Sequence, residues 1–217
     1  MPRPMRIGIT QRVAYDPNYG ERRDALATDW YRFLLRVWPD AVIVPIPNRP
    51  DHVARLLDTV APDLLVLTGG NDLGTEPERD QTERACLLEA ARRELPVIGV
   101  CRGFQMMVDH DGGSLAPVER TEHVATRHPV HCLRDTAWGW AAGRSLDVNS
   151  YHGFAVPSDG LPGTWIALAQ GADGTVEAAC TNDGRCTAVM WHPEREPEPA
   201  PLDVALFRQC LTRGQMP

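Results

Sequence analysis

The chain has 217 residues, of which 43% are hydrophobic and 24% charged, and its formal net charge is −7. This composition and length suit a folded α/β protein, and we expect residues 1–217 to form a single domain. All 22 basic residues are arginines without a basic run, which argues against a nucleic-acid partner and excludes lysine Schiff-base chemistry and a Walker-type phosphate loop.

No run reaches the apolar length of a signal peptide or a membrane span. We therefore expect a cytoplasmic protein with no membrane partner. In that compartment its six cysteines would be free thiols, and their spacing matches no zinc pattern.

Short apolar runs alternate with helical patterns through the first half of the chain, which is typical of a parallel sheet wrapped by helices. The expected order is strand 6–10, helix 24–38, strand 41–47, helix 51–59, strand 63–70, helix 80–95, strand 96–100 and helix 102–110. From about 114 to 190 short strands and turns dominate, with a hairpin around 181–185. A last helix is expected at 201–213. This order predicts an α/β fold with a mostly parallel central sheet.

A cysteine stands between two glycines where a predicted strand meets a predicted helix, in the stretch IGVCRGFQMM. Gly99 and Gly103 relieve crowding at a sharp turn, and a helix starting at Arg102 places its positive end beside the Cys101 sulfur. The pattern G-x-C-x-G is similar to the nucleophile elbow G-x-S-x-G, and its setting favours a thiolate. On its own, so short a pattern also fits a small core cysteine.

A general base is available near the end of the chain, where His192 follows an apolar run and Glu194 lies two residues beyond. A histidine at the carboxyl end of a strand lies on the edge where open parallel sheets carry their sites. Glu194 is placed to orient the imidazole through its second nitrogen. His192 alone also fits an exposed His-Pro turn, but together with Cys101 it predicts a catalytic site.

The stretch GVCRGFQMM followed near the end of the chain by WHPERE is similar to the class I glutamine amidotransferase-like family, in particular its stand-alone γ-glutamyl hydrolases. LTGGNDL, NSYHGFAV and DGTVEA also fall in that family's order, so the resemblance spans nearly the whole chain. It implies a flavodoxin-like three-layer sandwich and a triad of Cys101, His192 and Glu194. It also implies an oxyanion hole from the backbone N–H groups of Gly70 and Arg102.

The same resemblance implies a γ-glutamyl pocket, lined by Gly69, Asn71, Gln105, Ser150, Tyr151 and His152. Gln105 also fits a cap on the wall of the site, and Tyr151 and His152 also fit packing residues. No cofactor is expected. The sequence shows no carboxylate cluster that matches its other histidines, so no metal is assigned to His110, His123, His128 or His131.

The segments GITQRV, ERRDAL, GGNDL and ERD resemble hydrolases that act on γ-glutamyl-CDP-amidate, in a pathway that makes phosphoramidate for capsular sugars. Arg12 follows the first strand, and Arg22 and Arg23 precede the first helix, where their guanidinium groups suit an anionic leaving group. These arginines equally fit surface ion pairs.

The expected partner is thus a small γ-glutamyl amide that the chain hydrolyses through a thioester, and a homodimer is left open. Three alternatives share this chemistry: a γ-glutamyl-aminobutyrate hydrolase, a γ-glutamyl-polyamine hydrolase, and a glutaminase subunit that supplies ammonia to a synthetase. A non-enzymatic binding protein fits least, because the cysteine, histidine and glutamate are all present.

Overall fold

The structure, a computed structural model, describes residues 3–211. Parallel strands form one half of its main sheet: β4 (Val42–Ile46), β1 (Arg6–Thr10), β5 (Leu64–Leu67), β6 (Val97–Val100) and β13 (Cys186–Val189), in that order. Antiparallel strands continue it: β12 (Thr175–Thr181), β11 (Trp165–Gly171), β8 (Val124–Cys132) and β9 (Ser145–Tyr151). The short strands β10 (Phe154–Pro157) and β7 (Ala116–Pro117) pair with each other, and β10 also pairs with β12.

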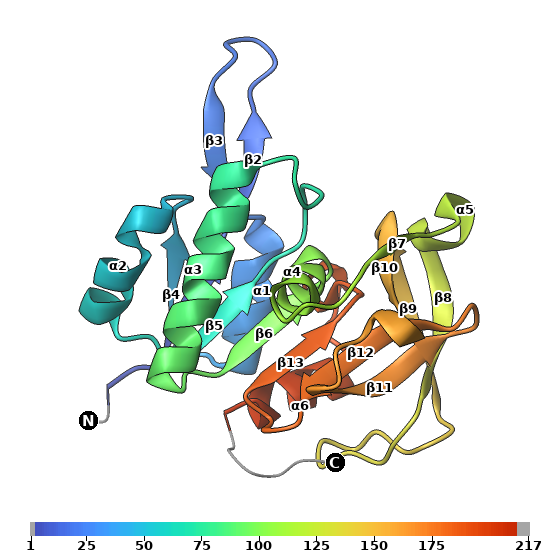
Figure 1. Ribbon diagram of the computed structural model, residues 1–217. Coiled ribbons are helices and arrows are strands. Elements are labelled where there is room, and N and C mark those ends of the chain that lie inside the picture. The colour runs from blue at the N-terminus through green and yellow to red at the C-terminus, as the bar shows by residue number, and fades with distance from the viewer. Residues whose placement is uncertain (1–2, 212–217) are drawn as a thin grey trace.

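Helices cover both faces of the parallel half (Figure 1). On one face α1 (Thr28–Val37) and α6 (Pro201–Gln209) share a hydrophobic core with the strands, and the rings of Phe33 and Phe207 meet edge to face at 4.8 Å. On the other face lie α2 (Val53–Val60), α3 (Pro77–Arg93) and α4 (Arg102–His110), which bury Leu57, Leu87 and Phe104. This arrangement confirms the predicted three-layer α/β sandwich, in which the helix-covered central part of the sheet is parallel.

The predicted helix at 24–38 was wrong at its start. Residues 24 and 25 belong instead to β3 (Arg22–Ala25), which forms a hairpin with β2 (Arg12–Tyr15) that projects from the body of the molecule (Figure 1), and the helix begins at Thr28. The turn of the hairpin is closed by Asp16, whose side chain accepts from the N–H of Asn18 and whose carbonyl accepts from the N–H of Gly20. Local turn chemistry therefore overrides the helical spacing.

The other predicted elements are found with shifted ends. A 3₁₀ turn, η1 (Pro50–His52), precedes α2, and α3 starts three residues early at Pro77, a residue suited to the first turn of a helix. The helix predicted at 201–213 ends at Gln209, and residues 212 and 213 lie outside the described residues. Within residues 3–211, no helix has the length and apolarity needed to cross a membrane.

Candidate active site

Cys101 occupies a strained turn between β6 and α4. Its backbone has φ 53° and ψ −110°, a left-handed conformation that costs a non-glycine residue about 1–3 kcal/mol. A Cβ at Gly103 would lie 2.1 Å from the carbonyl oxygen of Leu67, and one at Gly99 would lie 2.4 Å from the sulfur of Met107. The two glycines therefore allow α4 to pack tightly against β5 while the turn presents Cys101 at the edge of the sheet.

His192 reaches the same edge because β13 runs parallel to β6. Its Nδ1 lies 2.7 Å from Oε1 of Glu194, which the short helix η3 (Pro193–Arg195) holds in place. A Cβ at Gly69 would lie 2.6 Å from the imidazole Cε1 and 3.4 Å from the Cβ of Cys101. The thiol, the imidazole and the Gly69 backbone therefore converge on one point.

The three side chains are almost fully buried, so their charges interact strongly. Burial alone lowers the pKa of His192, but the negative charges of Cys101 and Glu194 outweigh burial and raise that pKa to about 9. The raised pKa of His192 favours the charged imidazole at neutral pH. This is the state that a thiolate–imidazolium pair requires.

Asn149 fixes the backbone of His192 from both sides. Its Oδ1 accepts from the N–H of His192 at 2.9 Å, and its Nδ2 donates to the carbonyl of His192 at 2.9 Å. Asn149 is not among the predicted site residues, although it directly precedes the segment Ser150–His152. The available signal was a polar side chain inside an otherwise strand-like run.

Arg79, also overlooked, orders the loop that precedes α3. Its guanidinium donates to the carbonyls of Thr68 (2.8 Å), Gly69 (3.0 Å) and Gly70. The carbonyl of Gly69 and the N–H of Gly70 belong to the same peptide, and in a trans peptide these two groups point in opposite directions. Because the Gly69 carbonyl faces Arg79, the N–H of Gly70 points away from Arg79. The buried guanidinium is balanced by Glu83 at 3.2 Å. This geometry suits the predicted oxyanion donor at Gly70.

Arg102 contributes to this region through two different groups. As the first residue of α4, its backbone N–H has no carbonyl partner within the helix and stands next to Cys101. Its side chain instead turns into the protein, where it pairs with Asp80 and Glu83. The buried pairs therefore anchor the start of the helix that supplies the second predicted oxyanion donor.

Most residues expected to line the substrate pocket bind other parts of the protein. The Asn71 amide exchanges hydrogen bonds with the Val13 backbone, and Gln105 Nε2 donates to the Phe154 carbonyl at 2.7 Å. Ser150 Oγ donates to the His123 carbonyl at 2.6 Å. These side chains hold neighbouring backbone segments, and their contact with substrate stays a prediction.

Tyr151 and His152 point in different directions. The Tyr151 ring, half-exposed, lies edge to face with His192 at 5.7 Å, and the guanidinium of Arg195 lies over it at 4.2 Å. His152 is buried, with Nδ1 3.0 Å from the Phe154 carbonyl. Tyr151 is therefore the member of this segment that borders the catalytic histidine candidate.

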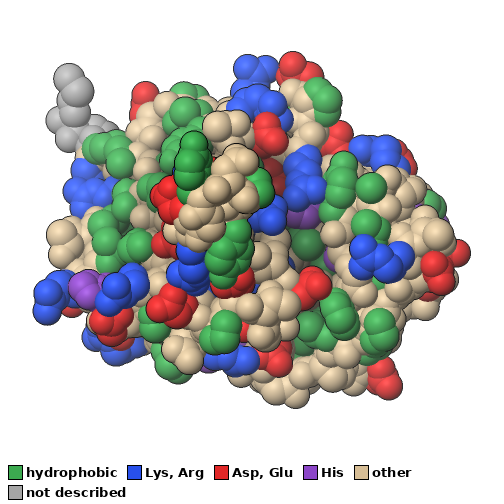
Figure 2. Space-filling view, turned by 90° about the horizontal axis from the view of Figure 1, so that it is seen from above, with side chains coloured by type: hydrophobic (Ala, Val, Ile, Leu, Met, Phe, Trp, Pro, Cys, Tyr) green, Lys and Arg blue, Asp and Glu red, His purple; other side chains and the backbone are tan. Residues whose placement is uncertain are grey.

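The three candidate anion-binding arginines lie in the hairpin, and among them only the Arg12 side chain has no hydrogen-bond or ion-pair partner within residues 3–211. A Cβ at Gly70 would lie 3.3 Å from its Nε, so the guanidinium stands over the proposed oxyanion loop. Arg22 pairs with Glu78 at 2.8 Å, and Arg23 pairs with Glu21 at 2.8 Å. Seen from above, arginine, acidic and apolar side chains surround a hollow with a histidine visible in it (Figure 2).

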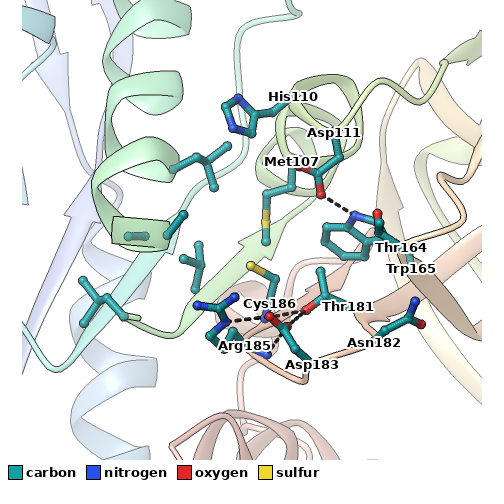
Figure 3. A pocket seen from close by; sticks show the side chains of 15 residues that line it. Met107, His110, Asp111, Thr164, Trp165, Thr181, Asn182, Asp183, Arg185 and Cys186 are labelled. Atoms are coloured by element: carbon teal, nitrogen blue, oxygen red, sulfur yellow. Dashed lines mark hydrogen bonds and ion pairs between the residues drawn. The ribbon is translucent and has the colours of Figure 1, made fainter. Parts of the chain in front are cut away.

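A pocket of about 430 Å³ lies at the opposite edge of the sheet. Its lining includes Val97 and Cys186, the first residues of β6 and β13, whereas Cys101 follows the last residue of β6. Trp165 Nε1 donates to Asp111 at 2.7 Å in its wall (Figure 3). This pocket is therefore separate from the Cys101 site.

The chain is similar to a known family over most of its length. The peptidase C26 family model matches residues 6–194. The chain is 28% identical to γ-glutamyl-CDP-amidate hydrolase of Campylobacter jejuni, covering 88% of this chain and 91% of that protein. It is 32% identical to a glutamine amidotransferase-type protein of Mycobacterium tuberculosis, covering 86% and 66%.

A solved structure from Thermoplasma acidophilum, described as a component of GMP synthase, superposes with a TM-score of 0.71 at 20% identity. The match covers 96% of this chain and 93% of that one, so the two share the glutamine amidotransferase fold. Because the family model spans most of the sequence, the chain belongs to the peptidase C26 family of glutamine amidotransferase-like hydrolases.

Proposed function

We propose that the protein hydrolyses a γ-glutamyl amide to free glutamate through a thioester on Cys101. The observation that carries this proposal is the strained turn that sets Cys101 beside His192, which is itself hydrogen-bonded to Glu194. A strained backbone at the junction of a buried strand and a helix is costly, and such strain concentrates at reactive sites. A cysteine that served only as packing would not need it.

In the proposed reaction the Cys101 thiolate attacks the γ-carbonyl carbon and forms a tetrahedral intermediate. The N–H groups of Gly70 and Arg102 stabilise its oxyanion, each by about 3 kcal/mol. The His192 imidazolium gives its proton to the leaving nitrogen as the C–N bond breaks. Neutral His192 then takes a proton from water, whose oxygen attacks the thioester, and glutamate leaves as the thiolate is restored.

For the leaving group we propose a nucleotide phosphoramidate, such as that of γ-glutamyl-CDP-amidate. Two findings support it: Arg12 stands unpaired over the Gly70 loop, and the Campylobacter jejuni relative carries this substrate in its name. A guanidinium binds phosphate through two parallel N–H donors. Arg22 and Arg23, which are paired with carboxylates, are less available for such a contact.

The purified protein alone should release glutamate at about 1–1000 per second from its preferred substrate. Mass spectrometry would compare a γ-glutamyl nucleotide phosphoramidate, γ-glutamyl-aminobutyrate, a γ-glutamyl polyamine and glutamine. Release from none of the four by folded protein would overturn the proposed hydrolase. Glutamine cleavage that starts only when a synthetase is added would instead establish the ammonia-supplying glutaminase.

Replacing the free arginine tests the leaving group. Arg12→Lys should raise the KM for the nucleotide substrate about tenfold, because lysine cannot reproduce the two parallel donors and one lost charge-assisted bond costs roughly 1.4 kcal/mol or more. Cleavage of an uncharged γ-glutamyl anilide should hardly change. Arg23→Lys, which alters an exposed ion pair in the same hairpin, is the matched control and should leave the KM for both substrates unchanged. Equal losses on both substrates for Arg12→Lys would assign Arg12 a structural role.

A further inference from the structure

Three histidines and a glutamate from distant parts of the sequence meet in the antiparallel half of the sheet. They are His123 at the end of α5 (Arg120–His123), His128 in β8, His152 between β9 and β10, and Glu177 in β12. One nitrogen or carboxylate oxygen from each lies within 4.8 Å of all the others. No matching carboxylate is evident near these histidines in the sequence because Glu177 comes from β12, a strand far along the chain.

Hydrogen bonds at the rim of the cluster fix the protonation of two rings. His123 Nε2 lies 2.9 Å from the carboxylate of Asp173, and His152 Nδ1 lies 3.0 Å from the carbonyl of Phe154. Both acceptors require an N–H, so in each neutral ring the other nitrogen carries a lone pair. Those two nitrogens, His123 Nδ1 and His152 Nε2, face each other at 3.4 Å. Two lone pairs at this distance repel unless a cation lies between them.

The remaining two members also direct unpaired atoms into the cluster. Nε2 of His128 and Oε2 of Glu177 are buried without a hydrogen-bond partner. They lie 3.9 Å apart, and Glu177 Oε1 lies 3.6 Å from His152 Nε2. The Glu177 carboxylate is fully buried, and although its Oε1 accepts a hydrogen bond from Thr175 Oγ1 at 3.3 Å, a buried Oε2 without a partner is costly. Four unpaired electron-pair donors thus surround one small volume.

We propose that His123, His128, His152 and Glu177 bind a zinc ion. Zinc takes nitrogen and carboxylate oxygen ligands at about 2.0–2.1 Å in a tetrahedron, which places ligand atoms about 3.3 Å apart. The separations of 3.4 Å between His123 Nδ1 and His152 Nε2 and of 3.9 Å between His128 Nε2 and Glu177 Oε2 approach this value, and all four ligand atoms lie within 4.8 Å of one another. Asp173 and the Phe154 carbonyl complete the site, because histidine ligands of metals donate their second N–H to such acceptors. Four protein ligands leave no open position, so the site is structural.

The site's position connects it with the active site of the proposed hydrolase. Zinc would tie together α5, β8, β12 and the segment after β9 that contains His152. Tyr151, the neighbouring residue, packs on His192, and Phe154 accepts the hydrogen bond from Gln105. The metal would therefore hold the wall of the catalytic pocket without contacting Cys101.

Metal content tests the site without any measurement of hydrolysis. Protein produced with zinc in the medium and purified without a histidine tag should contain about one zinc per chain by mass spectrometry of the metal. His128→Gln, which removes the least buried ligand, should abolish retention, and Asp173→Asn should weaken zinc binding about 10–100-fold. His131→Gln, an exposed histidine on the same strand, should retain zinc fully. Cobalt in place of zinc should give the strong visible absorption of a tetrahedral complex.

Two results would overturn the zinc site. One is protein that is folded by circular dichroism yet carries almost no zinc and takes up none when zinc is titrated into it. The other is His128→Gln protein that retains as much zinc as the His131→Gln control. Because metal content is read without substrate, either result leaves the proposed hydrolase untouched, and inactive protein with a full complement of zinc would refute only the hydrolase.

Discussion

Cys101→Ala should lower hydrolysis of the preferred γ-glutamyl amide about 10⁶-fold, which is the typical cost of removing a covalent nucleophile. Alanine lacks the sulfur that forms the thioester, while the backbone donors of Gly70 and Arg102 remain in place. Substrate binding should therefore persist, and calorimetry of the inactive variant should return an affinity near the KM of the unaltered protein. The rate is measured as glutamate released per chain.

The remaining cysteines provide the control for this experiment. Burial raises the thiol pKa of each of these cysteines, to about 12 for Cys186, so they are poor nucleophiles at neutral pH. The five are Cys86, Cys132, Cys180, Cys186 and Cys210. Cys186 lines the pocket at the opposite edge of the sheet, so Cys186→Ala should leave the rate of hydrolysis unchanged. A trapped γ-glutamyl thioester on any cysteine other than Cys101 would refute the assignment.

The catalytic candidates were predictable because each lies in a short local pattern. Glycines on both sides of Cys101 mark a sharp turn, and an apolar run before His192 marks a strand that ends at the sheet edge. The parallel pairing of β6 and β13 then brings the two patterns together, as expected when both follow the carboxyl ends of parallel strands. The local patterns and the general topology of parallel sheets were therefore sufficient to predict that Cys101 and His192 lie together.

The supporting residues were not predictable in the same way, because their roles depend on contacts between distant segments. Arg79 and Glu83 have the spacing of an ordinary exposed ion pair on a helix, and nothing local shows that they are buried beneath the Gly70 loop. Asn149 looks like a polar residue in a strand until β9 is placed beside His192. The hairpin of β2 and β3 was hidden by apolar spacing that also fits a helix.

The base and its orienting carboxylate should differ in how much activity they carry. His192→Asn should lower the rate nearly as far as Cys101→Ala, about 10⁶-fold, whereas Glu194→Gln should lower it about 10⁴-fold. Histidine transfers the proton in both halves of the proposed reaction, while Glu194 only holds the ring and stabilises its charged form. Glu198→Gln, an exposed carboxylate in the same segment, should have no effect.

The pH profile separates orientation from a purely structural role of Glu194. Interactions with Cys101 and Glu194 raise the folded-state pKa of His192 to about 9, above the ordinary value of 6.5. The charge on His192 therefore makes its full contribution to stability below pH 6.5, and both this contribution and kcat/KM should fall as the pH rises through about 9. Glu194→Gln removes one of the negative charges that hold this proton, so the residual activity should be lost at a lower pH. If Glu194→Gln loses activity at the same high pH as the unaltered protein, Glu194 does not act through His192.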